Sequence, residues 1–103
     1  MFDLKQWKAE HVAERKAYRE WRYRERRTAA VIAKGAVCVK CGSAKRLEFD
    51  HIDRSRKTAN MDSLFRDASQ KRIDAEVALC QLLCESCHGR KSRYEYLSSR
   101  AGT

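Results

Sequence analysis

Two short stretches decide the fold: Cys38–Gly42 (CVKCG) and Cys84–His88 (CESCH), each with two cysteines separated by two residues. Such a stretch, called a knuckle below, turns tightly enough to aim both sulfurs at one ion, and Gly42 suits that turn. Two knuckles complete the tetrahedral set of four thiolates that zinc prefers. The sequence therefore predicts one structural Zn²⁺ ion bound by Cys38, Cys41, Cys84 and Cys87.

Length and charge fit a small, metal-stapled protein with a polyanionic partner. The chain has 103 residues, which limits the size of its core, and a formal net charge of +9. Small chains often need a metal ion or disulfides to be stable. A charge excess of this size points to nucleic acid, an acidic membrane surface or an acidic protein as partner.

The sequence also bears on location. It has no apolar run near the ~20 residues that a membrane span needs, and its first residues lack the apolar core of a secretory signal. We therefore expect a cytoplasmic protein, where cysteines bind metals more often than they form disulfides. A redox-active cysteine pair and buried apolar cysteines are the alternatives to zinc for the two knuckles.

Gly35 divides the chain into a basic arm, 1–34, and a cysteine-containing domain, 35–103. The arm contains no Gly or Pro, so we expect one long helix capped by Asp3 and ended by Gly35. Helical spacing predicts an aromatic face formed by Leu4, Trp7, His11, Tyr18 and Trp21. It also predicts a basic stripe formed by Arg15, Arg19, Arg22 and Arg26. We expect the aromatic face to dock on the core and the stripe to follow DNA phosphates.

Periodicity in the second part predicts an α+β domain. A strand is expected over 45–52, a helix over 61–78, a second strand over 80–83 and a final helix over 85–97. Tyr94 and Leu97 are expected to face inward from the final helix. Cys80, outside the two knuckles, lies in an apolar run and is expected to be a buried thiol.

The segment between the knuckles carries candidate catalytic residues, Asp50 and His51, and His88 follows the last cysteine. Zinc bound by both knuckles would bring the three together. An acid and an imidazole suit a divalent ion that keeps bound water, and a second imidazole suits a general base. Basic residues accompany them: Arg54, Arg56, Lys57, Arg90 and Lys91. This set suits phosphodiester hydrolysis. Adjacent side chains of a regular strand point to opposite faces, so Asp50 and His51 can face one site only if the strand bends or ends there. We predict that irregularity.

The combination CVKCG…LEFDHID…QLLCESCHGRK resembles the HNH endonuclease family, with its ββα-metal (His-Me finger), treble-clef-like core. It is most similar to small zinc-knuckle HNH proteins of bacteriophages and restriction systems, over roughly 37–92. The resemblance implies that Asp50 and His88 hold a catalytic Mg²⁺, Mn²⁺ or Ni²⁺ ion, that His51 is the general base and that Lys91 contacts phosphate.

One family feature is replaced. The Asn that normally steadies the catalytic loop or orients the base falls near position 79, where this chain has Leu79 and Cys80. Asn60, Asp74 and Glu76 are the candidates to take its role.

The sequence thus predicts a metal-dependent DNA endonuclease or nickase that holds DNA mainly through its phosphates. The alternative is a zinc-knuckle nucleic-acid-binding protein without catalysis. A third reading, implied only by the resemblance, is an accessory module that acts with a phage terminase or other packaging proteins in the host cytoplasm.

Overall fold

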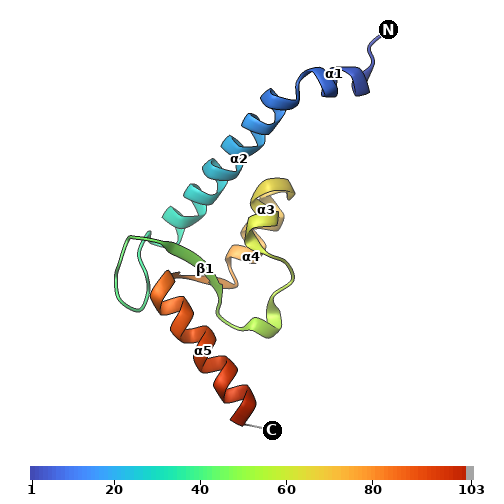
Figure 1. The fold of residues 1–103 in the computed structure, drawn as a ribbon. Coiled ribbons are helices and arrows are strands. Elements are labelled where there is room, and N and C mark those ends of the chain that lie inside the picture. Colours follow the sequence, from blue (N-terminus) through green and yellow to red (C-terminus); the bar gives the residue numbers. More distant parts are fainter. Residues whose placement is uncertain (102–103) are drawn as a thin grey trace.

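Two antiparallel strands form the centre of this computed structural model, which describes residues 1–101 and the side chains of residues 1–98. Strand β1 (Leu47–His51) pairs with β2 (Cys80–Cys84) along its whole length. Helix α5 (Glu85–Ala101) starts directly after β2 and packs along the sheet (Figure 1). The two strands and the start of this helix agree with the ranges predicted from periodicity.

The described residues form a small α+β fold with five α-helices, a short 3₁₀ helix η1 (Arg54–Arg56) and one two-stranded sheet. Figure 1 shows the N-terminal helices projecting from the sheet as an arm. Among these helices, none has both the length and the apolar character needed to cross a membrane.

The arm is two helices rather than the predicted single one: α1 (Leu4–Glu10) and α2 (Val12–Ala33). The break is at His11, where φ is −117° and ψ is 27°. Its Nδ1 donates a hydrogen bond to the Trp7 carbonyl oxygen at 2.7 Å, and its ring stacks on the Trp7 ring at 4.4 Å between centroids. These local contacts compete with regular helix geometry, and neither Gly nor Pro signals the break.

Both predicted ends of the arm are confirmed. The Asp3 carboxylate caps α1 by accepting hydrogen bonds from the backbone amides of Lys5, at 3.0 Å, and Gln6, at 3.3 Å. At the other end, Gly35 follows the last helical turn with φ at +94°. That left-handed conformation costs glycine little and ends α2 at the expected place.

The predicted docking of the aromatic face on the core is wrong. Trp21 is 52% exposed, and Trp7 and Tyr18 are exposed as well. A different face of α2 packs on helix α3 (Met61–Asp67): the Tyr23 hydroxyl donates to Asp62 at 2.9 Å, and Ala30 joins the buried core. Helical spacing identified a shared face, but it could not tell which face the small core would cover.

The helix predicted over 61–78 is also interrupted. It forms α3 (Met61–Asp67) and α4 (Gln70–Val77), and the Ser69 hydroxyl caps α4 by accepting from the Arg72 amide at 3.2 Å. Cys80 is buried, as predicted. It belongs to the main core cluster, whose buried members are Ala30, Met61, Leu64, Phe65, Ile73, Val77 and Cys80.

The C-terminal helix corrects a further expectation. Tyr94 is 73% exposed and Leu97 is exposed too, so neither faces inward. Helix α5 continues past the end of the five-residue strands, and Figure 1 shows its last turns extending away from the sheet. The sheet is too short to cover these residues.

Candidate metal centre and active site

The four knuckle cysteines converge as their spacing predicted. The sulfurs of Cys38, Cys41, Cys84 and Cys87 all lie within 4.8 Å of one another. The Cys41 and Cys84 sulfurs are 3.6 Å apart. Tetrahedral zinc with Zn–S bonds of ~2.3 Å places its sulfurs about 3.8 Å apart. The cluster can therefore bind a metal such as zinc.

The backbone around the cluster explains this convergence. In the first knuckle, the Gly42 amide donates to the Cys38 carbonyl oxygen at 2.9 Å, and Gly42 has φ at +78°. The Val39 amide donates to the Leu82 carbonyl oxygen at 3.0 Å, which ties this turn to β2. The second knuckle starts where β2 ends and continues into the first turn of α5.

The charge balance of the cluster also favours a cation. Burial alone would raise the pKa of Cys38, but backbone N–H groups of Cys84, Cys41 and Lys40 lower it to about 6. Cys87 shows the opposite: hydrogen bonding to Cys84 and burial raise its pKa to about 12. Thiolates this close repel one another, and a divalent ion would remove that repulsion.

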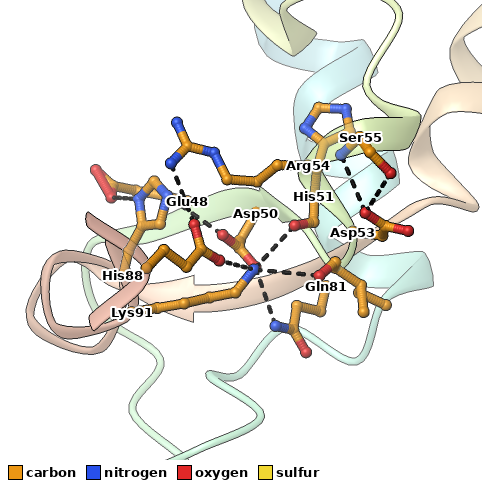
Figure 2. A network of polar contacts seen from close by, with 11 residues as sticks. Glu48, Asp50, His51, Asp53, Arg54, Ser55, Gln81, His88 and Lys91 are labelled. Atoms are coloured by element: carbon orange, nitrogen blue, oxygen red, sulfur yellow. Dashed lines mark hydrogen bonds and ion pairs between the residues drawn. The ribbon is translucent and has the colours of Figure 1, made fainter. Parts of the chain in front are cut away.

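Alternation along β1 puts Glu48 and Asp50 on one face and His51 on the other, with Leu47 and Phe49. Glu48 and Asp50 point toward α5, where they meet His88 and Lys91 (Figure 2). The ring of His51 points to the opposite face, toward α4. The predicted irregularity between Asp50 and His51 is absent: β1 pairs regularly with β2 through both residues, and their side chains therefore point to opposite faces.

Asp50 and His88 lie next to each other, as expected for two ligands of one ion. Asp50 Oδ1 is 3.4 Å from His88 Nε2. Glu48 Oε1 is 2.6 Å from His88 Nδ1, and a carboxylate on one ring nitrogen leaves the other to face a metal. Glu48 was not among the predicted site residues, although its position two residues before Asp50 places it on the same strand face.

The second oxygen of Asp50 is held by donors. Lys91 Nζ lies 2.6 Å from Oδ2, and Gln81 Nε2 donates to it at 3.0 Å. Lys91 also donates to the His51 carbonyl oxygen at 2.9 Å and lies 3.3 Å from Glu95. Burial lowers the pKa of Lys91, but these two carboxylates outweigh it and raise the pKa. Lys91, which was predicted to contact phosphate, thus ties helix α5, on which it lies, to Asp50 of β1.

His51 is buried against Glu76, one of the three residues that the sequence offered in place of the Asn found in HNH proteins. His51 Nε2 lies 2.7 Å from Glu76 Oε2. Asp74 instead accepts from the Gln70 side chain at 2.8 Å on the exposed side of α4. Asn60 precedes α3 as its N-terminal cap residue.

A groove of about 470 Å³ joins the two faces of β1. His51 and His88 both line it, so an extended ligand in the groove could reach both imidazoles. The other lining residues are Tyr23, Arg27, Glu48, Phe49, Lys57, Asn60, Met61, Asp62 and Ser63.

The predicted DNA-contact residues fall into different places. Lys57 lines this groove, Arg56 is exposed, and Arg54 pairs with Glu95 at 3.1 Å. Arg90 lies two residues after His88, which on a helix puts it on the opposite side of α5. There it lines a second hollow, of about 680 Å³, with three basic residues that were not among the predicted contacts: Lys45, Arg46 and Arg93.

The basic stripe of α2 is only partly available to a ligand. Arg26 donates to the Ala68 carbonyl oxygen at 2.6 Å and to that of Phe65 at 3.4 Å, so it supports the fold. Arg19 lies 3.6 Å from Asp67 in an exposed pair. Arg15 and Arg22 are partly exposed on the arm.

Comparison with protein families, with curated proteins and with solved structures finds no match to this chain. The resemblance to HNH proteins therefore rests on the motifs of the sequence alone.

Proposed function

We propose that this chain is a metal-dependent HNH-type DNA endonuclease or nickase. The observation that carries the proposal is the 3.4 Å approach of Asp50 Oδ1 to His88 Nε2, because His88 and His51 line the same groove. An acid and an imidazole are suitable ligands for a hard or borderline divalent ion. When bound there, such an ion would offset the charge that develops on the phosphate.

The residues of the chain would perform the remaining work. Glu48 holds the His88 ring with Nε2 toward Asp50. His51 has Glu76 at Nε2, which leaves Nδ1 to accept a proton from the attacking water. Water oxygen bonds to phosphorus as the P–O3′ bond breaks, giving a 5′-phosphate and a 3′-hydroxyl that takes its proton from solvent.

DNA is the proposed substrate because the chain is strongly basic, as a protein that binds a polyanion would be. The net charge is +9, and basic residues lie on the arm, along the groove and beside the knuckles. Basic side chains bind phosphates, and contacts to phosphates position DNA but carry no sequence information. We therefore propose weak sequence preference and, with a single site per chain, cleavage of one strand at a time.

A plasmid assay with purified wild-type protein tests this proposal. Supercoiled DNA is incubated with Mg²⁺, Mn²⁺ or Ni²⁺ or with excess EDTA, and open-circle product is quantified beside a gel-shift measurement of binding. The proposal expects nicking with at least one metal and none with EDTA. Binding without nicking under every metal would contradict it.

One contact favours the non-catalytic alternative. The Lys91 ammonium already neutralises Asp50 at 2.6 Å, as in a structural ion pair. In a pure DNA-binding protein, this pair would only tie α5 to the sheet. Lys91→Met separates the two readings, because it should change nicking in an endonuclease and only stability in a binding protein. Nicking is measured as the amount of open-circle product, and stability as the free energy of unfolding in urea.

A further inference from the structure

Glu76 is a buried carboxylate with an unusual number of donors. It is 1% exposed and lies on the core-facing side of the short helix α4, beside the buried Ile73 and Val77. Oε2 faces His51 Nε2 at 2.7 Å and accepts from the Thr58 amide at 3.1 Å. Oε1 accepts from the Thr58 hydroxyl at 2.6 Å and from Arg72 at 3.1 Å. Both oxygens therefore have at least two partners each.

We infer that Glu76 is the positioning residue of the proposed base, fixing the ring of His51 and the nitrogen that acts. A carboxylate oxygen can only accept, so Nε2 must carry the proton in this contact, and the lone pair is left on Nδ1. The inference rests on the proposed function, in which His51 activates water. It gives Glu76 the supporting role for which the sequence left Asn60, Asp74 and Glu76 as candidates.

The charge state of Glu76 fits this role. Burial raises its pKa, but the two Thr58 donors, His51 and Arg72 outweigh burial and lower the pKa to about 2. Glu76 is thus a carboxylate throughout the neutral range. Arg72 and the Thr58 hydroxyl hold Oε1, and the Thr58 amide also holds Oε2, so the acceptor is fixed before any substrate binds.

Position in the fold also favours Glu76 over the other two candidates. Helix α4 leads directly into β2, and β2 pairs with the strand that carries His51. Glu76 is therefore held at a fixed distance from His51 by the sheet itself. Asp74 lies on the exposed side of the same helix and binds Gln70, which makes it a matched control.

The test is a comparison of Glu76→Gln, Asp74→Asn and wild type in single-turnover nicking with the metal that supports wild-type activity. Supporting groups of this kind typically contribute 10–100-fold, so we expect Glu76→Gln to slow nicking by about that factor. DNA affinity should stay within about twofold, because Glu76 is buried away from the substrate. Asp74→Asn should match wild type in both respects.

A double-mutant cycle separates positioning from a merely structural role. If Glu76 acts through His51, adding Glu76→Gln to His51→Ala should cause no further loss in the residual nicking rate. If Glu76→Gln slows nicking by the same factor in the wild-type protein and in His51→Ala, the inference is overturned. Wild-type nicking rates in Glu76→Gln alone would also overturn it. If Glu76→Gln does not fold, Thr58→Val replaces it: it removes one donor to the carboxylate and should give a smaller loss that again depends on His51.

The same experiments distinguish failure of the proposed endonuclease function from failure of the inference about Glu76. A wild-type protein that nicks nothing overturns the proposed function and this inference with it. An active wild type with an equally active Glu76→Gln overturns only the inference. Histidine-selective ¹⁵N NMR adds a readout independent of activity: a His51 Nε2 proton that exchanges slowly in wild type and faster in Glu76→Gln is expected. An equally protected proton in both proteins would overturn the inference.

Discussion

At the scale of single residues, the alternation along β1 is what builds the candidate site. Glu48 and Asp50 reach His88 on one side of the sheet, while His51 reaches Glu76 on the other. A five-residue strand thus gathers partners from two helices that are distant in the sequence. The groove that passes both imidazoles is what makes the two sides one candidate site.

The sequence predicted the chemistry-bearing residues better than their supports. The knuckle cysteines were identifiable because metal-binding cysteines follow spacing rules. Glu48 and Glu76 were harder, because a Glu on a strand or helix is usually solvated and no spacing rule links it to a histidine 40 or 25 residues away. Only the pairing of β1 with β2 brings these supports to their histidines.

The knuckle cysteines carry the first prediction. Wild-type protein should hold about one tightly bound zinc per chain, and Cys84→Ser should lose it, because three thiolates bind zinc far more weakly than four. Metal analysis after dialysis measures the stoichiometry, and thermal unfolding measures the accompanying loss of stability.

Cys80→Ala is the matched control for that prediction. Its thiol is buried in the core and donates to the Glu76 carbonyl oxygen at 3.4 Å, away from the cluster. This variant should unfold at a lower temperature but keep its zinc. Zinc retained by Cys84→Ser would contradict the assignment of the cluster.

At the scale of elements, the strands and the ends of the arm followed from local signals, whereas the helix breaks did not. Asp3 and Gly35 carry the capping chemistry that ends helices, and both were recognised. The break at His11 depends on a ring contact with Trp7, and the break before Ser69 on a hydroxyl cap within a periodic segment. Neither contact follows from composition or periodicity.

The packing of α2 on α3 gives the second prediction. Arg26 satisfies carbonyl oxygens at the end of α3, notably that of Ala68 at 2.6 Å. Arg26→Gln should therefore lower the free energy of unfolding by about 1–2 kcal/mol, since charged hydrogen bonds to partly buried groups contribute at that level. Urea denaturation measures the change.

Arg24→Gln is the control, because Arg24 is exposed two residues earlier on the same helix. It should change the free energy of unfolding by less than about 0.5 kcal/mol, as is usual for surface positions. Equal destabilisation by both substitutions would show that Arg26 does not join the two helices.

At the scale of the whole molecule, the shape is elongated and the charge is spread along it. The radius of gyration is 17.6 Å, against the ~13 Å of a compact chain of this length. The length, 63 Å along the longest axis, comes from α2 and α5, which project from a small core. Such a shape presents basic residues over a long surface, which suits a polyanion.

The arm gives the third prediction, in which Arg22 contacts a DNA phosphate and Arg24, on the opposite side of α2, does not. Arg22→Gln should weaken DNA binding and reduce the slope of log affinity against log salt by about 0.9, the value for one phosphate contact. Fluorescence anisotropy over a salt series measures both. Identical slopes for Arg22→Gln and wild type would remove the arm from the proposed interface.

The central claim is that Asp50, His51 and His88 form a phosphodiester-cleaving site. Its most direct test is the rate at which wild type, His51→Ala and His88→Ala convert supercoiled plasmid to open circle under the same metal. We predict metal-dependent conversion by wild type and rates at least about 100-fold lower for each variant, the usual contribution of a general base or a metal ligand. Wild-type rates in either variant would contradict the claim.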